Sequence, residues 1–153
     1  SGRIIEPAPK LFIGSAEMPT QGKANPEKIL NKINTGVNFF QTQYVFDEKI
    51  LKDYMKILED SGILEKTFFI IGLGPFTSAK AAKWMNENLF GVDIPDTIIK
   101  RLEQAKNQEE ESKKICLELI KNFQEIKGVK GVHLMGHKKE QLISEIIKDS
   151  KKN

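Results

Sequence analysis

Two glutamines stand where a buried strand would be expected to continue with aliphatic residues. Segment 38–47 reads NFFQTQYVFD, so an apolar start gives way to Gln41 and Gln43, followed by aromatic and acidic residues. With the two-residue period of a strand, Phe39, Gln41 and Gln43 share one face. An amide side chain offers both a donor and an acceptor, which suits a flat heterocycle. The same amides could instead close the backbone of their own loop, and the pattern alone leaves both readings open.

Small residues follow two other apolar runs. A side chain without bulk lets a ligand approach the backbone, but small residues are also ordinary turn material. The segment 72–78, GLGPFTS, resembles a glycine-rich phosphate loop only superficially, because the third glycine is missing. The small residues concerned are Gly14, Ser15 and Ala16 after the first run, and Gly72, Gly74 and Pro75 after the third.

Metal and hydrolytic chemistry find little support. His133 and His137 are four residues apart but fall in a strand and the loop after it, so they do not form a helical metal pair. No carboxylate spacing resembles a metal signature. Ser15 and Ser78 have no convincing histidine and acid partners for a nucleophilic triad. We therefore expect neither a metal site nor a catalytic residue from these positions.

The apolar period switches between strand and helix along the whole chain. Caps mark several helix starts: Asn25 is followed by Pro26, Asp47 precedes an amphipathic stretch, and Thr77 and Ser78 open the helix after the third strand. The strands are predicted at 10–16, 38–43, 67–74 and 131–136, and the helices at 25–36, 47–62, 77–89, 94–105, 107–126 and 138–150. On the third helix, Trp84 and Met85 are more typical of core positions than of ligand contacts.

Alternating strands and helices predict a parallel sheet with right-handed crossovers. Two folds fit, a doubly wound sheet and part of a (βα)8 barrel. A complete barrel takes about 250 residues, so on that reading the chain is roughly half of one, with two strand edges left to be covered. The carboxyl ends of all four strands should then form one site. A doubly wound nucleotide-binding domain would need a phosphate loop after its first strand, and GSAEMP is a poor one.

Composition narrows the class of protein. With 153 residues, of which 39% are hydrophobic, we expect one half-barrel domain over 1–153, with 1–9 as linker and 10–153 as four βα units. The net charge of +3 is a small excess of 24 basic over 21 acidic residues, which argues against nucleic acid as a partner. Apolar runs fall short of the roughly 20 residues of a membrane span, and we expect no membrane segment and no leader. The single cysteine, Cys116, excludes a disulfide within the chain and favours a buried residue in a reducing cytoplasm.

Several segments resemble one family in their order along the chain. They are RIIEPAPKLFIGSAEMP, NKINTGVNFFQTQYVFD, GLGPFTSAKAAKWMNE, IPDTIIKRLEQA and GVKGVHLMG. Together they are similar to the carboxyl-terminal half of methylenetetrahydrofolate reductase, a flavin-dependent (βα)8 barrel. The likeness covers nearly the whole chain, and QTQYVFD is its most specific piece.

The resemblance implies reduction of 5,10-methylenetetrahydrofolate to 5-methyltetrahydrofolate, with FAD passing a hydride from NADH or NADPH. Gln43 falls on the family's folate-binding glutamine. Met85 falls beside the folate tail, where relatives carry an aromatic or apolar residue. Ala16 and Met18 lie on the flavin-contacting loop, although some relatives have tyrosine at the latter place. Lys32 matches a lysine that approaches the phosphates of the flavin cofactor; without the resemblance it would read as a solvated helix lysine.

One departure limits what this chain could do alone. The family's acid that protonates the folate belongs to the amino-terminal half, and Glu17 does not align with it. We expect the isolated chain to be inactive and to associate with an amino-terminal half-barrel or a second copy of itself. The alternative function is a non-catalytic half-barrel that binds folate or flavin weakly or serves as an assembly subunit.

Overall fold

The four predicted strands form one parallel sheet in sequential order. In the computed structural model, which describes residues 6–7, 9–136 and 138–151, the sheet order is β1-β2-β3-β4. The strands are β1 (Ile13–Glu17), β2 (Val37–Tyr44), β3 (Phe68–Leu73) and β4 (Val129–Leu134). A strand order without reversal lacks the switch point of a doubly wound sheet and matches successive strands of a (βα)8 barrel.

The helices agree with the predicted pattern, including the additional helices before the last strand. Asn25 and Asp47 cap the first two helices through their side chains, and Ser78 caps the third. The first predicted strand begins later than expected, at Ile13 instead of Lys10. The helices are α1 (Pro26–Asn34), α2 (Glu48–Asp60), α3 (Ala79–Asn88), α4 (Asp96–Gln104), α5 (Gln108–Gln124) and α6 (Glu140–Ser150), with short 3-10 turns η1 (Thr20–Gly22) and η2 (Ile63–Glu65).

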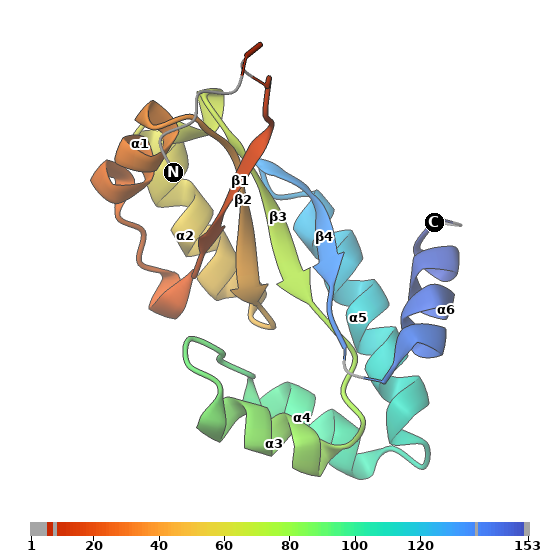
Figure 1. The fold of residues 1–153 in the computed structure, drawn as a ribbon. Helices are drawn as coiled ribbons and strands as arrows, with labels where there is room; N and C mark the ends of the chain where they lie inside the picture. The colour runs from red at the N-terminus through yellow and green to blue at the C-terminus, as the bar shows by residue number, and fades with distance from the viewer. Residues whose placement is uncertain (1–5, 8, 137, 152–153) are drawn as a thin grey trace.

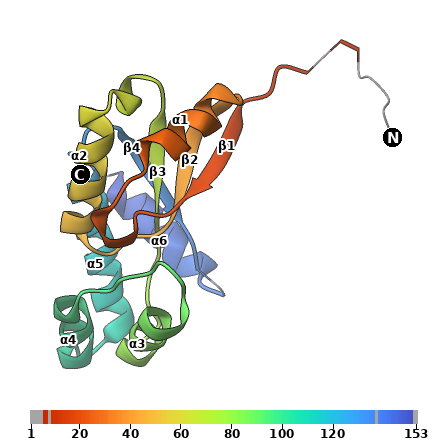
Figure 2. The same ribbon diagram turned by 90° about the vertical axis from the view of Figure 1, so that its left-hand side faces the viewer.

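In the described part of the chain, the helices that pack on the sheet cover one of its faces. Helices α2 and α5 lie behind the sheet in Figure 1, and the quarter turn of Figure 2 shows both on the same side of it. α1 lies beside β1 and β2, with its Ile29 fully buried. α3 and α4 lie beyond the carboxyl ends of the strands (Figure 1). The core fills the space between sheet and helices, where Phe40, Phe69 and Ile71 are fully buried. Cys116 of α5 is also fully buried, as predicted.

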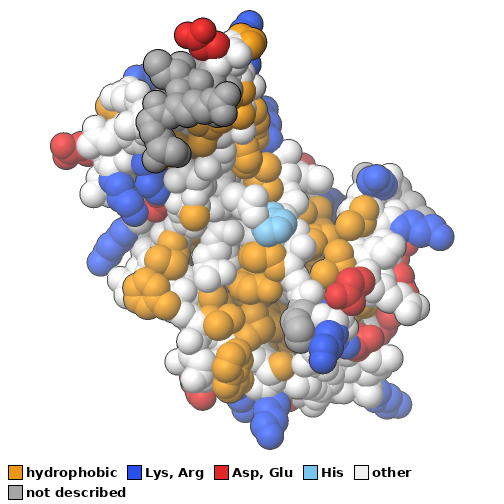
Figure 3. Space-filling model, viewed as in Figure 1, with side chains coloured by type: hydrophobic (Ala, Val, Ile, Leu, Met, Phe, Trp, Pro, Cys, Tyr) orange, Lys and Arg blue, Asp and Glu red, His pale blue; other side chains and the backbone are white. Residues whose placement is uncertain are grey.

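Among the described residues, no helix covers the opposite face of the sheet. Figure 3 shows hydrophobic side chains running along this face, with histidine atoms in their midst. Near the start of the strands, Phe12, Phe39 and Phe68 stack in a row, with ring centroids 5.4 Å apart for the first pair and 5.7 Å for the second. Phe12 is 68% exposed. In a closed barrel this face would be the interior, so we refer to it as the inner face and to these three residues as the phenylalanine row.

Two side chains of α3 for which core positions were predicted differ in burial. Met85 is half-buried and packs against the core. The expectation that Trp84 belongs to the core is wrong, because its side chain is 56% exposed. The two residues are adjacent on one helix, and the helical period directs adjacent side chains about 100° apart. The sequence pattern did not determine which one faces inward.

Candidate functional site

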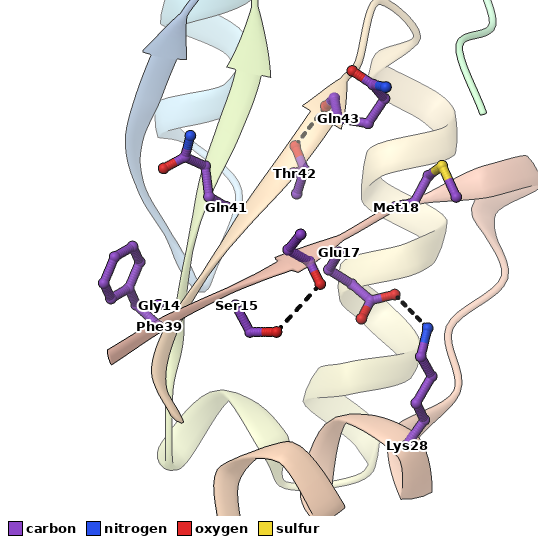
Figure 4. Close-up of a pocket in the computed structure, with 10 residues that line it drawn as sticks. Gly14, Ser15, Glu17, Met18, Lys28, Phe39, Gln41, Thr42 and Gln43 are labelled. Carbon is purple, nitrogen blue, oxygen red and sulfur yellow. Dashed lines mark hydrogen bonds and ion pairs between the residues drawn. The ribbon is translucent and has the colours of Figure 1, made fainter. Parts of the chain in front are cut away.

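The inner face is hollowed at the carboxyl half of β1 and β2. The cavity has a volume of about 600 Å³, within the range of small-molecule sites. Figure 4 shows its lining, which comes from the two strands, the segment after β1, and α1. The lining residues are Gly14, Ser15, Ala16, Glu17, Met18, Lys28, Phe39, Gln41, Thr42 and Gln43.

An irregularity in β2 sets the position of the second glutamine. The pairing register between β2 and β3 shifts between Gln41 and Tyr44. At this point the backbone N–H of Gly72 donates to the Thr42 hydroxyl oxygen at 2.8 Å, and that hydroxyl donates to the Gln43 carbonyl at 2.8 Å. A bulge of this kind changes the direction of a side chain at the end of a strand. It leaves Gln43 half-buried at the edge of the cavity, not sealed in the core.

Both readings of the glutamine pattern are realised in part. The side-chain oxygen of Gln43 accepts a hydrogen bond from the backbone N–H of Tyr44 at 3.0 Å, which closes its own strand end. The same side chain lines the cavity. Its amide nitrogen is therefore the group left to interact with a ligand.

Missing side chains make room on the inner face. A Cβ atom on Gly14 would lie 2.5 Å from Cζ of Phe39, so the glycine lets this ring lie across β1. Gly72 packs directly against backbone, since a Cβ there would lie 2.5 Å from the Thr42 carbonyl oxygen. The cavity thus combines the apolar ring of Phe39 with the amides of Gln41 and Gln43.

The predicted site residues divide into two groups. Gln43, Ala16 and Met18 line the one cavity. Met18 also packs on Gly91, where a Cβ would lie 2.1 Å from the methionine sulfur, and so joins the end of β1 to the loop after α3. Met85 and Lys32 do not line this cavity.

Lys32 contacts two residues at the end of β1. Its ammonium group donates to the Ala16 carbonyl at 2.8 Å and lies 3.0 Å from Oε2 of Glu17. It also lies 5.6 Å from the ring centre of Phe40, which belongs to the covered face of the sheet. The lysine that lines the cavity is Lys28, whose side chain is 58% exposed and lies 3.5 Å from Oε1 of Glu17. A role for Lys32 at flavin phosphates stays a prediction.

Sequence reasoning placed Gln41 and Phe39 on the same face as Gln43 but did not include them in the site. The signal was present in the two-residue period. Lys28 and Glu17 gave no comparable signal, because their contact joins a helix to a strand eleven residues away. Within 6–7, 9–136 and 138–151, no group of three or more His, Cys, Asp or Glu residues is arranged to hold a metal ion.

The sequential sheet and its uncovered inner face define half of a (βα)8 barrel, with a cavity along β1 and β2. The sequence profile of the methylenetetrahydrofolate reductase family matches residues 16–151. The chain belongs to this family.

A solved structure has the same fold. It is an uncharacterised protein from Clostridium thermocellum described as binding two copies of 5-methyl-5,6,7,8-tetrahydrofolic acid, with a TM-score of 0.67 and 20% sequence identity. The match covers 93% of this chain and 53% of the other, so this chain spans about half the length of that neighbour. At this identity the likeness shows the fold alone. Among curated proteins, none matches the chain. No helix in the described part of the chain is long and apolar enough to cross a membrane.

Proposed function

We propose that this chain is the carboxyl-terminal half of a flavin-dependent barrel that reduces 5,10-methylenetetrahydrofolate to 5-methyltetrahydrofolate. The observation that carries the proposal is the cavity of about 600 Å³, which Gln43 lines while the backbone N–H of Tyr44 binds its side-chain oxygen. The family membership and the folate named for the structural neighbour support the same substrate class. Met85 is the second residue that we assign to the folate, at its tail.

The cofactor would share this cavity. Ala16 and Met18 would contact the flavin ring of FAD, and the apolar ring of Phe39 suits such a neighbour. Bound FAD would supply hydride transfer from NADH or NADPH. The residues of this chain would bind and orient the heterocycles and exclude water from them. Lys32 would reach flavin phosphates only after exchanging its contacts with Glu17 and Ala16.

The inner face would be completed by a partner. Phe12 of the phenylalanine row is 68% exposed, and no described residue pairs with the outer edge of β1 or β4. An amino-terminal half-barrel or a second copy of the chain would cover this surface. Alone, the chain would show negligible turnover with FAD, NADH or NADPH and folate.

Folate binding by the purified chain tests the proposal. Titration calorimetry with 5-methyltetrahydrofolate should show binding by the unmodified chain and at least tenfold weaker binding by Gln43→Leu, the loss that one hydrogen bond of about 1.4 kcal/mol implies. The matched control is Gln124→Leu, the same change at an exposed position near the end of α5. Equal affinity of Gln43→Leu and Gln124→Leu would contradict the proposal.

A second candidate function is favoured by the exposed aromatic surface. A non-catalytic half-barrel could use the phenylalanine row only for assembly. Adding FAD and an amino-terminal half of a related enzyme separates the two: a yellow complex that oxidises NADH supports the reductase. A colourless complex without turnover supports the assembly subunit.

A further inference from the structure

A second glutamine in the cavity is held by a histidine from another strand. The side-chain nitrogen of Gln41, on β2, is in hydrogen-bond contact with Nδ1 of His133, on β4. β3 lies between these strands, and its Gly72 pairs with His133 in the sheet register. Because a glycine carries no side chain, the two groups can meet across the middle strand on the inner face.

The chemistry of this contact fixes the orientation of both groups. An amide nitrogen only donates, so Nδ1 of His133 must accept and the ring proton must sit on Nε2. Gln41 has then used one of its amide protons on the histidine. No other hydrogen bond to the Gln41 side chain is found among the described residues. Its side-chain oxygen is left as an acceptor in the cavity.

In Gln43 the side-chain oxygen, and not the nitrogen, is the atom already bound within the protein. The backbone N–H of Tyr44 binds its side-chain oxygen at 3.0 Å, which leaves the amide nitrogen as a donor. Gln41 and Gln43 lie two residues apart on β2, where the register to β3 shifts, and both line the cavity. The cavity lining therefore contains an acceptor and a donor, each held by a partner of its own, on side chains that extend in different directions from β2 (Figure 4).

We propose that Gln41 is a second binding residue for the pterin ring, accepting a hydrogen bond from its amino or ring N–H group, and that His133 is the positioning residue that aims it. This inference rests on the proposed folate function. A pterin carries N–H donors and a carbonyl acceptor along one edge, which complements an acceptor at Gln41 and a donor at Gln43. Because partners within the protein already hold both side chains, less conformational entropy is lost when the ligand binds, and the affinity is higher.

Two substitutions at one position separate a ligand contact from a structural role. Gln41→Leu removes the acceptor and should weaken binding of 5-methyltetrahydrofolate about tenfold, the effect of one hydrogen bond. Gln41→Glu keeps an acceptor oxygen, which His133 can meet by moving its ring proton to Nδ1, and should bind within about threefold of the unmodified chain. If Gln41 merely supports the sheet, the charge that Gln41→Glu places at this half-buried position should weaken binding at least as much as Gln41→Leu. That order of affinities would overturn the proposal.

The positioning role has a spectroscopic readout that does not depend on the ligand. Nitrogen-15 spectra of the imidazole should show the Nε2–H form of His133 in the unmodified chain. His133→Phe removes the hydrogen-bond partner of Gln41 and leaves Gln41 itself unchanged. This substitution should weaken folate binding several-fold. An Nδ1–H form in the unmodified chain, or unchanged affinity in His133→Phe, would contradict the positioning role.

Failure of this inference can be told from failure of the function. The titrations are run beside Gln43→Leu, with Gln124→Leu as the control at an exposed position. If Gln43→Leu loses affinity while Gln41→Leu binds within about twofold of the unmodified chain, the function stands and the inference is wrong. If the unmodified chain does not bind 5-methyltetrahydrofolate, both are wrong.

Discussion

Lys32 and Glu17 form an ion pair in which the acid is nearly buried: Nζ and Oε2 lie 3.0 Å apart, and the Glu17 side chain is 8% exposed. The pair fastens α1 to the end of β1 beside the cavity. Removing one partner of a buried pair leaves the other charge without compensation, which costs more than the pair itself contributes.

This geometry predicts unequal roles for two lysines. Lys32→Ala should lower the free energy of unfolding by about 1–3 kcal/mol, because Glu17 loses its shorter contact. Lys28→Ala should change it by less than about 1 kcal/mol, because that lysine is largely exposed. Urea unfolding followed by circular dichroism measures both. Equal effects of the two changes would show that Glu17 is not held in this way.

Two glycines of the sheet should differ in their tolerance of an added methyl group. At Gly72 a Cβ would lie 2.5 Å and 2.6 Å from the carbonyl oxygens of Thr42 and Gln43, and a backbone contact cannot yield as a flexible side chain can. We expect Gly72→Ala to destabilise the fold by about 2–4 kcal/mol. At Gly131, on β4, nothing lies within 4 Å of the added atom. Gly131→Ala should then be neutral within about 0.5 kcal/mol in the same assay.

The thiol of Cys116 should make stability depend on pH in alkaline solution. Burial raises the pKa of this thiol to about 12, whereas an unfolded thiol titrates near about 8.5. Between these values the folded state holds the proton more tightly than the unfolded state. The stabilisation is complete below the lower value and is lost as pH rises, by about 1.4 kcal/mol per pH unit.

Comparison with Cys116→Ala isolates this effect. All other titrating groups are common to both proteins, so the difference between their unfolding free energies should shrink as pH rises from 9 to 11. Urea unfolding at several pH values measures it. A difference that stays constant would mean that the thiol is already ionised or is accessible in the folded state.

The phenylalanine row should govern association. Phe12→Ser removes the most exposed ring of the row and should weaken both self-association and capture of an amino-terminal half-barrel, because burial of aromatic surface drives such contacts. Light scattering over a concentration series measures the first and co-elution the second. Phe90→Ser is the control, since Phe90 is 83% exposed but lies in the loop after α3. If both variants associate like the unmodified chain, the row is not a contact surface.

Local patterns were enough to predict the elements and the order of the fold. Asn25, Asp47 and Ser78 act as caps through contacts with nitrogens two or three residues away, which a sequence displays directly. The alternation in β2 likewise predicted one face for Phe39, Gln41 and Gln43, and all three line the cavity, although the register shift after Gln41 redirects Gln43. Such features depend on neighbours along the chain.

The partners of the site residues could not be predicted in this way. Gln41 and His133 are 92 residues apart, and their contact depends on the sheet order and on Gly72 lying between them. Lys32 read as a solvated helix lysine or, through the family, as a phosphate contact, but its position beside Glu17 follows from how α1 packs on β1. These contacts are properties of the assembled sheet.

The register shifts in this sheet also constrain any partner that completes the barrel. Shifts occur in all three strand pairs, between Ile13 and Gly14, between Gln41 and Tyr44, and between Phe69 and Ile70. A cylinder closes only if the stagger summed around its circumference returns to a fixed whole number of residues. The four strands of this chain contribute a fixed part of that stagger. The strands of the partner must therefore contribute the rest in whole residues. If the partner paired one residue out of register, the side chains of its pairing strand would exchange faces. The side chains meant for the outside of the barrel would then meet the phenylalanine row.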